Sequence, residues 1–181
     1  MNTNQQHKNI SKFLSLVLRH MPDTISLNLD ENGWADISEL IEKCNNHNVL
    51  LNIQLLEEIV TTNDKQRFAF NDDKTKIRAN QGHSITVELD LEDKMPPEIL
   101  YHGTAERFLG SILKNGILKQ SRQQVHLSAN IDTAKKVGAR HGKPVVLTVK
   151  ASAMYNAGHK FYLSQNGVWL TDFVHPEFLI E

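Results

Sequence analysis

The stretch that decides the fold of the second half of this chain is Leu100-Tyr101-His102-Gly103-Thr104, taken together with Val125-His126-Leu127-Ser128. Each is a short apolar run that ends in a histidine and a small or hydroxylated residue. The first predicts a strand that stops at Gly103, after which Thr104 caps a helix. Such a strand-turn-helix exposes backbone N–H groups at the start of the helix, where phosphate binds well. Taken by itself, His102 is better explained by a local hydrogen bond at the end of a strand.

Short strand patterns continue through the rest of the second half. Residues 145–149 form an apolar, β-branched run, and three more short strands are expected at 161–163, 167–170 and 178–180. Residues 132–137 predict a helix that stops at Gly138. This spacing is typical of a compact, mostly antiparallel α+β domain.

The first half begins with three predicted helices. In the first, the apolar residues from Ile10 fall at helical spacing after a cap at Asn9 or Ser11. Pro22 disfavours helix at Met21, so the pattern predicts an end there, with Arg19 and His20 in the last turn. Two further caps are expected, at Asp36 with Glu39 as a capping box and at Asn52.

A hairpin follows these helices. Phe68 and Phe70 alternate with polar residues, residues 71–74 supply a turn, and Ile77 starts a return strand. Three helices followed by a hairpin is the order of a winged-helix module, which normally meets nucleic acid. The basic residues around this hairpin are mixed with acidic ones, so a weak nucleic-acid surface and a solvated wing both stay open.

The boundary between the two halves is expected in residues 92–97, which are acidic and then carry Pro96-Pro97. Just before it, alternating apolar residues at 85–91 predict one strand with a buried face. We therefore expect one domain at residues 1–92 and a second at residues 97–181.

Composition limits the possible functions. The 181 residues have a net charge of -1, so any anion site must come from locally placed arginines. Cys44 is the one cysteine, so an intramolecular disulfide is excluded and a reducing compartment is favoured. We expect a cytoplasmic protein, because neither a membrane-spanning run nor a signal-peptide core is present. Metal-ligand spacings and nucleotide-loop motifs are absent too, so we expect no metal.

Several segments together carry a resemblance to a known family. Their order and joint presence are much more specific than any one of them. The sequence closely resembles the bacterial RNA 2′-phosphotransferase family (KptA), relatives of the eukaryotic enzyme that removes the splice-junction 2′-phosphate from tRNA. The matching segments are residues 11–15 with 18–20, Gly33-Trp34, 63–68, 77–79 with 81–84, 101–104, 125–128, 137–140 and 166–170.

The resemblance implies an N-terminal winged-helix-like RNA lobe and a C-terminal lobe of the ADP-ribosyltransferase fold. It also implies four essential residues, Arg19, His20, Arg67 and Arg122, which we expect to converge on the RNA phosphate. Planar guanidinium groups hold phosphate oxygens in a fixed geometry, and a histidine near neutral pH can supply a proton to the departing RNA hydroxyl. Where the family often has a histidine after the last arginine, this chain has Gln123.

The reaction implied by the resemblance has two steps and uses NAD⁺ as co-substrate. The RNA 2′-phosphate attacks the anomeric carbon of the nicotinamide ribose, and nicotinamide leaves. The ribose 2″-hydroxyl then attacks the ADP-ribosylated phosphate, which frees RNA with a 2′-hydroxyl and gives ADP-ribose 1″,2″-cyclic phosphate. The residues implied to bind NAD⁺ in the C-terminal lobe are His102, Gly103, Thr104, His126 and Ser128.

Three functions are weighed against one another. The first is the NAD⁺-dependent RNA 2′-phosphotransferase, a transferase of tRNA processing or RNA repair whose partner is 2′-phosphorylated RNA, with a monomer favoured. The second is an ADP-ribosyltransferase that acts on another acceptor, such as a terminal nucleic-acid phosphate. Val168 stands where many relatives carry a catalytic glutamate, which disfavours acceptors that need deprotonation. The third, a non-catalytic nucleic-acid binder, is disfavoured because Arg19, His20, Arg67 and Arg122 are all present.

Overall fold

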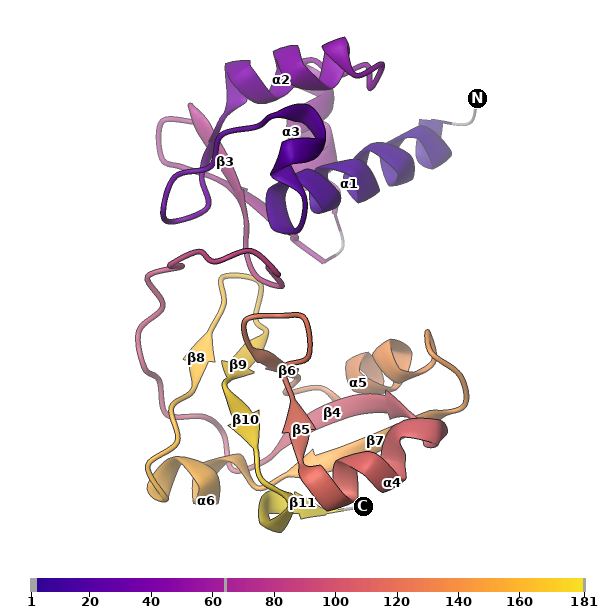
Figure 1. The fold of residues 1–181 in the computed structure, drawn as a ribbon, viewed down its shortest axis with the longest axis vertical. Coiled ribbons are helices and arrows are strands. Elements are labelled where there is room, and N and C mark those ends of the chain that lie inside the picture. The colour runs from indigo at the N-terminus through magenta and orange to yellow at the C-terminus, as the bar shows by residue number, and fades with distance from the viewer. Residues whose placement is uncertain (1–2, 64, 181) are drawn as a thin grey trace. The chain divides into compact units, whose positions relative to one another are not determined.

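Helix α1 (Thr3–Arg19) opens the first of the two compact units into which the chain divides, Met1–Asp90 and Leu91–Glu181. The computed structural model describes residues 3–63 and 65–180, so Asp64 of the matching segments lies outside the described residues. Both units combine helices with small antiparallel sheets (Figure 1). The expected α+β class is therefore confirmed.

The helices of the first unit are α1, the short 3-10 helix η1 (Pro22–Ile25), α2 (Ile37–Asn46) and α3 (Ile53–Thr61). Two predicted caps are confirmed: the Asp36 side chain accepts from Glu39 N, and the Asn52 side chain accepts from Leu55 N. The capping box with Glu39 is wrong, because the Glu39 carboxylate accepts from Asn28 N and Nδ2. The predicted start of α1 at Asn9 or Ser11 is wrong. The polar residues before Ile10 continue the helix on its exposed side, although they lack the apolar stripe on which the prediction relied.

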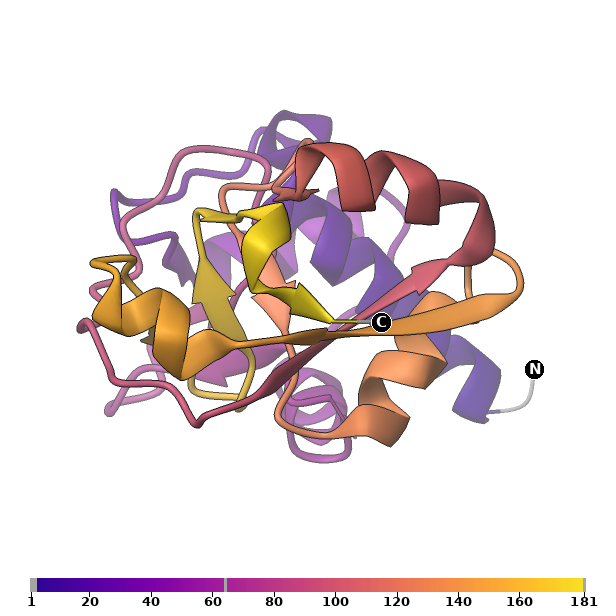
Figure 2. The ribbon, with the colours of Figure 1, turned by 90° about the horizontal axis from the view of Figure 1, so that it is seen from below.

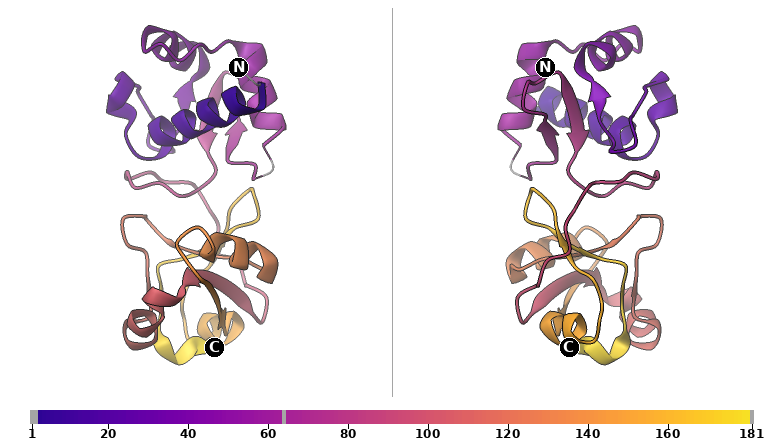
Figure 3. Two further views of the ribbon diagram at one scale, coloured as in Figure 1. Left: turned by 90° about the vertical axis from the view of Figure 1, so that its right-hand side faces the viewer. Right: turned by 90° about the vertical axis from the view of Figure 1, so that its left-hand side faces the viewer.

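A three-stranded antiparallel sheet in the order β1-β3-β2 completes the first unit. Strands β2 (Phe68–Phe70) and β3 (Lys76–Ala79) form the predicted hairpin, with Phe70 opposite Ile77. Strand β1 (Ala35–Asp36) pairs with the other edge of β3. Helix α1 packs against β3 in this unit (Figure 3).

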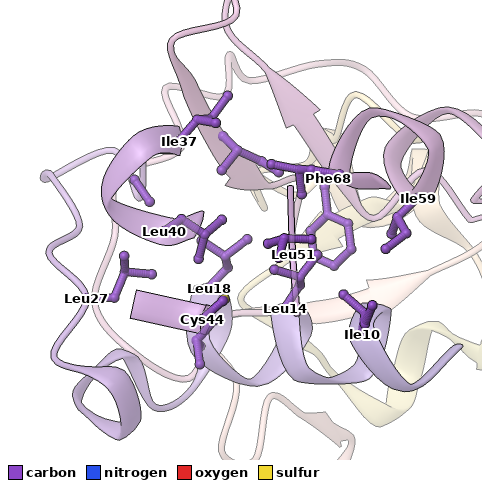
Figure 4. Close-up of a cluster of buried hydrophobic side chains, with 14 of the residues drawn as sticks. Ile10, Leu14, Leu18, Leu27, Ile37, Leu40, Cys44, Leu51, Ile59 and Phe68 are labelled. Atoms are coloured by element: carbon purple, nitrogen blue, oxygen red, sulfur yellow. The ribbon is translucent and has the colours of Figure 1, made fainter. Parts of the chain in front are cut away.

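The core of the first unit is a set of apolar side chains from all three helices and the sheet (Figure 4). Leu14, Leu18 and Leu40 are completely buried in it. Cys44 lies in the same core, where burial raises the pKa of its thiol to about 11, so this thiol is a packing group and stays protonated near neutral pH.

The predicted strand over residues 85–91 is wrong, because this segment has no regular secondary structure. Its backbone bonds go to a loop rather than to a sheet: Glu88 N donates to Glu31 O at 2.8 Å. Val87 is buried. The alternation of apolar and polar residues therefore reflects a segment that buries one of its faces without pairing with a strand.

The second unit contains three small sheets. The first, in the order β11-β7-β4, joins β11 (Leu179–Ile180), β7 (Pro144–Val149) and β4 (Leu100–Ala105). The second has the order β6-β9-β8, from β6 (Val125–Leu127), β9 (Trp169–Thr171) and β8 (Tyr162–Leu163). The third pairs β5 (Ile117–Leu118) with β10 (Phe173–Val174). The predicted strands near 100, 125, 145, 162, 168 and 179 are thus confirmed to within two residues.

Helices α4 (Glu106–Asn115) and α5 (Ile131–Gly138) lie on opposite sides of the β4–β7 pair, as Figures 1 and 2 show. A shorter helix, α6 (Ala151–Asn156), follows β7, and the 3-10 helix η2 (Pro176–Phe178) precedes β11. Buried residues of the strands, of α6 and of the segment before β8, among them Leu100, Met154 and Phe161, form the second core.

The predicted end of β4 at Gly103 and the predicted cap at Thr104 are wrong. The strand continues to Ala105, which is the N-cap residue of α4 and makes no side-chain capping bond. Thr104 is buried in the strand opposite Val145. The prediction took Gly103 as the end of the strand. The structure gives another reason for a glycine at this position: α5 crosses the strand here, and a Cβ on Gly103 would lie 1.7 Å from Ala134 O.

Among the helices of residues 3–63 and 65–180, none is both long and apolar enough to span a lipid bilayer.

Candidate functional site

Arg19 and His20 lie where α1 ends. Arg19 is the last residue of the helix, and the backbone N–H groups of His20 and Met21 both donate to Leu16 O at 2.9 Å. The chain then turns into η1 at Pro22, whose ring cannot continue a helix at this point. Arg19 is half-buried, whereas His20 is exposed.

Arg67 lies directly before β2 and is in contact with Arg19. The guanidinium of Arg19 donates through Nη2 to the backbone oxygen of Arg67 at 3.3 Å. The guanidinium of Arg67 in turn donates through Nη1 to Asn63 Oδ1, also at 3.3 Å. Asn63 is tied to α1, because its Nδ2 donates to Ser11 Oγ at 3.2 Å. Arg19, His20 and Arg67 are called the first cluster from here on.

The segment of residues 80–84, which follows β3, touches every member of the first cluster. Asn80 N donates to Arg67 O at 2.9 Å, and Ser84 N donates to Arg19 O at 2.9 Å. The Ser84 hydroxyl lies 2.9 Å from Nδ1 of His20. Residues 81–84 were part of a matching motif in the sequence, without an assigned role.

His83 is the most buried polar residue in that segment, with 1% of its surface exposed. Within the described residues, neither of its ring nitrogens has a hydrogen-bond partner. Burial lowers its pKa to about 4, and the neighbouring positive groups Arg19, His20 and Arg78 act in the same direction. His83 is therefore neutral near pH 7. It lies close to Arg19 and His20 and adds no positive charge to the first cluster.

In the second unit, His102 lies in the middle of β4 opposite Leu147. Its Nδ1 is 3.3 Å from the backbone oxygen of His126, the bond that joins β4 to β6 at this level. Burial lowers the pKa of His102, and the nearby Arg122 guanidinium acts in the same direction, while the bond to His126 opposes them. The expectation of a local hydrogen bond at the end of a strand is wrong, because His102 lies within β4 and bonds a residue 24 positions away. The ring is neutral near pH 7 with Nδ1 engaged.

Arg122 approaches the same place from the loop before β6. Its Nη1 lies 2.8 Å from Nδ1 of His126, so the guanidinium donates and the imidazole accepts. Burial lowers the pKa of Arg122, and so does a second positive group, Arg140, just after α5. The positive charge of Arg140 beside the buried Arg122 guanidinium favours a bound anion. His102, Arg122 and His126 are called the second cluster.

The three other residues implied to bind NAD⁺ make contacts within the fold. Ser128 Oγ accepts from Asn130 N at 3.0 Å and donates to Asn130 O at 2.9 Å, at the residue that caps α5. Gly103 and Thr104 lie under α5, where a Cβ on Gly138 would meet Thr104 O at 2.4 Å. These contacts explain their small size by packing, and a part in NAD⁺ binding stays a prediction for all three.

Sequence reasoning assigned no role to Asn63, Ser84 and Arg140, which contact or face the two clusters. All three lie within segments that resemble the known family, and this was the one available signal.

Within residues 3–63 and 65–180, no group of three or more His, Cys, Asp or Glu side chains is placed to hold a metal ion.

Comparisons with known proteins cover nearly the whole chain. Residues 5–173 match the family model described as "RNA 2'-phosphotransferase, Tpt1 / KptA family". A protein of Flavobacterium johnsoniae named "Probable RNA 2'-phosphotransferase" is 60% identical over 95% of this chain and 94% of its own length. Proteins of the same name from Acaryochloris marina and Fusobacterium nucleatum are 53% and 56% identical, over 98% and 94% of this chain and 98% and 96% of their own lengths. This chain therefore belongs to the RNA 2′-phosphotransferase, Tpt1 / KptA family.

Proposed function

We propose that this protein is an enzyme that removes an internal 2′-phosphate from RNA by transferring it to NAD⁺. Family membership and relatives of the same name over the full chain support the RNA 2′-phosphotransferase activity. The observation that carries the proposal is the bond from the Arg19 guanidinium to the backbone oxygen of Arg67, since it brings together, at the end of α1 where His20 follows, two arginines that are 48 residues apart. This pairing is what recognition of a phosphate dianion requires.

In the proposed reaction the first cluster binds the RNA 2′-phosphate. Each guanidinium can offer two parallel N–H groups to phosphate oxygens, which fixes the phosphate in line with its target better than a lysine would. The same groups stabilise the charge that remains on phosphorus in the second step, and such electrostatic stabilisation often accelerates a reaction more than any other effect of the enzyme. His20 donates a hydrogen bond to the phosphate and a proton to the departing RNA hydroxyl.

The second cluster suits NAD⁺, which supplies the ADP-ribosyl group when bound. His102 is neutral and its Nδ1 is engaged by His126 O, so Nε2 is left for a ribose hydroxyl. Arg122, beside Arg140, provides positive charge for a phosphate group. We propose that Arg122 is a catalytic residue, and that His126, Ser128, Gly103 and Thr104 complete the NAD⁺ site.

The proposal extends to the two halves of the chain. We assign residues 1–92 to a winged-helix-like RNA-binding lobe, supported by three helices and a hairpin after them, whose sheet β1 completes from before α2. We assign residues 97–181 to an ADP-ribosyltransferase-like lobe, supported by short, antiparallel strands with His102 on β4 and His126 on β6, two strands that an isolated bridge between Tyr101 and Ser128 joins. We further propose a monomer in the cytoplasm.

The test incubates the purified protein with NAD⁺ and an oligonucleotide that carries one internal 2′-phosphate. Formation of 2′-hydroxyl RNA and ADP-ribose 1″,2″-cyclic phosphate is expected. A stable ADP-ribosylated product would instead favour the alternative ADP-ribosyltransferase, and no reaction with NAD⁺ would refute the proposal.

Arg67→Ala should lower turnover by at least about 100-fold, the effect of removing one donor from a charged transition state. Its unfolding midpoint should change little, because the backbone oxygen that bonds Arg19 and Asn80 is kept. Arg107→Ala, which removes an exposed guanidinium from α4, is the matched control and should keep full activity. An active Arg67→Ala protein would show that the phosphate site is elsewhere.

A further inference from the structure

We infer that Ser84 is a positioning residue for His20: its hydroxyl holds Nδ1 of the imidazole, so that Nε2 is the nitrogen presented to the RNA phosphate. This inference rests on the proposed function and adds a residue to it. The carrying observation is the 2.9 Å separation of Ser84 Oγ and His20 Nδ1, across 64 residues of sequence.

Ser84 is itself held rigidly enough to orient another side chain. Its backbone N–H donates to Arg19 O at 2.9 Å, and this carbonyl belongs to the last turn of α1, which lacks helical partners for its oxygens. The residue before it, His83, is buried and packs near Gly33 and Val87. The backbone of Ser84 is thus held by its bond to Arg19 O and by the buried residue before it, and its side chain contacts His20, the residue after Arg19.

A hydroxyl is suited to this position because it serves both protonation states of the imidazole. It accepts from Nδ1–H when the ring is charged and when the neutral ring carries its proton on Nδ1, and it donates to Nδ1 when the neutral ring carries its proton on Nε2. The charged ring gives its Nε2 proton to an RNA oxygen and keeps the proton on Nδ1. The ring can therefore lose and regain its Nε2 proton without turning, since Nδ1 keeps its partner throughout.

The backbone bond and the side-chain bond of Ser84 can be separated by mutation. Ser84→Ala removes the hydroxyl and keeps the N–H that bonds Arg19 O. Ser84→Thr restores a hydroxyl at the same place. Thr86→Ala removes a hydroxyl from an exposed residue two positions later and is the matched control.

Four proteins are compared, the wild type and these three variants, by steady-state kinetics on 2′-phosphorylated RNA with NAD⁺. Ser84→Ala should lower kcat by about 10- to 100-fold, the effect expected from a misplaced catalytic group, with the KM for NAD⁺ little changed. Ser84→Thr should recover most of the lost kcat, and Thr86→Ala should match the wild type. An unchanged kcat in Ser84→Ala, or an equal loss in Thr86→Ala, overturns the inference.

A second readout does not depend on activity. The ¹⁵N resonance of His20 Nδ1 should move in Ser84→Ala, return in Ser84→Thr and stay unchanged in Thr86→Ala. An unmoved resonance in Ser84→Ala overturns the contact itself. If the wild type fails to act on 2′-phosphorylated RNA, the proposed function fails, and the resonance still decides whether Ser84 holds the ring.

Discussion

Replacing Gly103 by alanine should destabilise the second unit strongly. The added Cβ would lie 1.7 Å from Ala134 O, and real Cβ atoms keep about 3.0 Å from such atoms, so α5 and β4 would have to separate by roughly 1.3 Å. The obstacle is a backbone carbonyl, which cannot rotate away as a side chain does. Strand β4 cannot withdraw either, because it pairs with β7 over its whole length.

Overpacking of a close contact usually costs about 1–3 kcal/mol, and we expect the upper end here because both elements are backbone. For a unit of this size, about 3 kcal/mol corresponds to a fall in the melting temperature of roughly 12–24 °C. Unfolding is followed by the fluorescence of Trp169 in a Trp34→Phe background, so that the signal comes from the second unit.

Gly110→Ala is the control for the Gly103 substitution. Gly110 lies in α4, and a Cβ built on it meets no atom within 4 Å. It should therefore stabilise the unit by about 0.5–1 kcal/mol, the ordinary gain from replacing glycine in a helix. If Gly103→Ala unfolds at the same temperature as the starting protein, the close crossing of β4 by α5 is wrong.

Two further predictions concern the first unit. Because the folded-state pKa of His83 is about 4 and its ordinary value is 6.5, the unfolded chain binds the proton more tightly, and stability present above pH 6.5 is lost as the pH falls towards 4. Between pH 7 and pH 5 urea unfolding should show a loss of about 2 kcal/mol in the wild type that His83→Asn lacks; identical pH dependence in both proteins would contradict the buried neutral ring. Leu14→Ala, at a fully buried position, should cost about 2–5 kcal/mol in urea unfolding. Leu50→Ala, at a side chain that is 72% exposed, should change stability by less than about 0.5 kcal/mol, and equal losses would mean that Leu14 is not in the core.

The elements that sequence reasoning predicted correctly are those whose signals are local. The Asp36 and Asn52 caps, the hairpin of β2 and β3, and strand β7 each depend on residues within one turn or one strand. Local signals were misleading where a distant element decided the outcome. Gly103 suggested a strand end because the crossing of α5 is invisible in the sequence, and residues 85–91 alternate although no strand lies beside them.

The candidate site divides in the same way. The resemblance named Arg19, His20, Arg67 and Arg122, but it could not show which groups hold them. Asn63 and Ser84 contact Arg67 and His20 through bonds across 4 and 64 residues of sequence. The contact between Ser84 and His20 depends on how the whole chain folds between α1 and the segment after β3. The spacing of residues in the sequence does not predict that course.

The members of the first cluster all lie at the ends of elements rather than within them: Arg19 ends α1, His20 follows it, and Arg67 precedes β2. Such ends have backbone groups that their own element does not satisfy. In this unit the segment 80–84 satisfies two of them, at Arg19 O and Arg67 O. The bonds that complete the fold therefore also fix the reactive side chains. It follows that a substitution in this segment that breaks a backbone bond should impair stability and activity together, whereas loss of the Ser84 hydroxyl should impair activity alone.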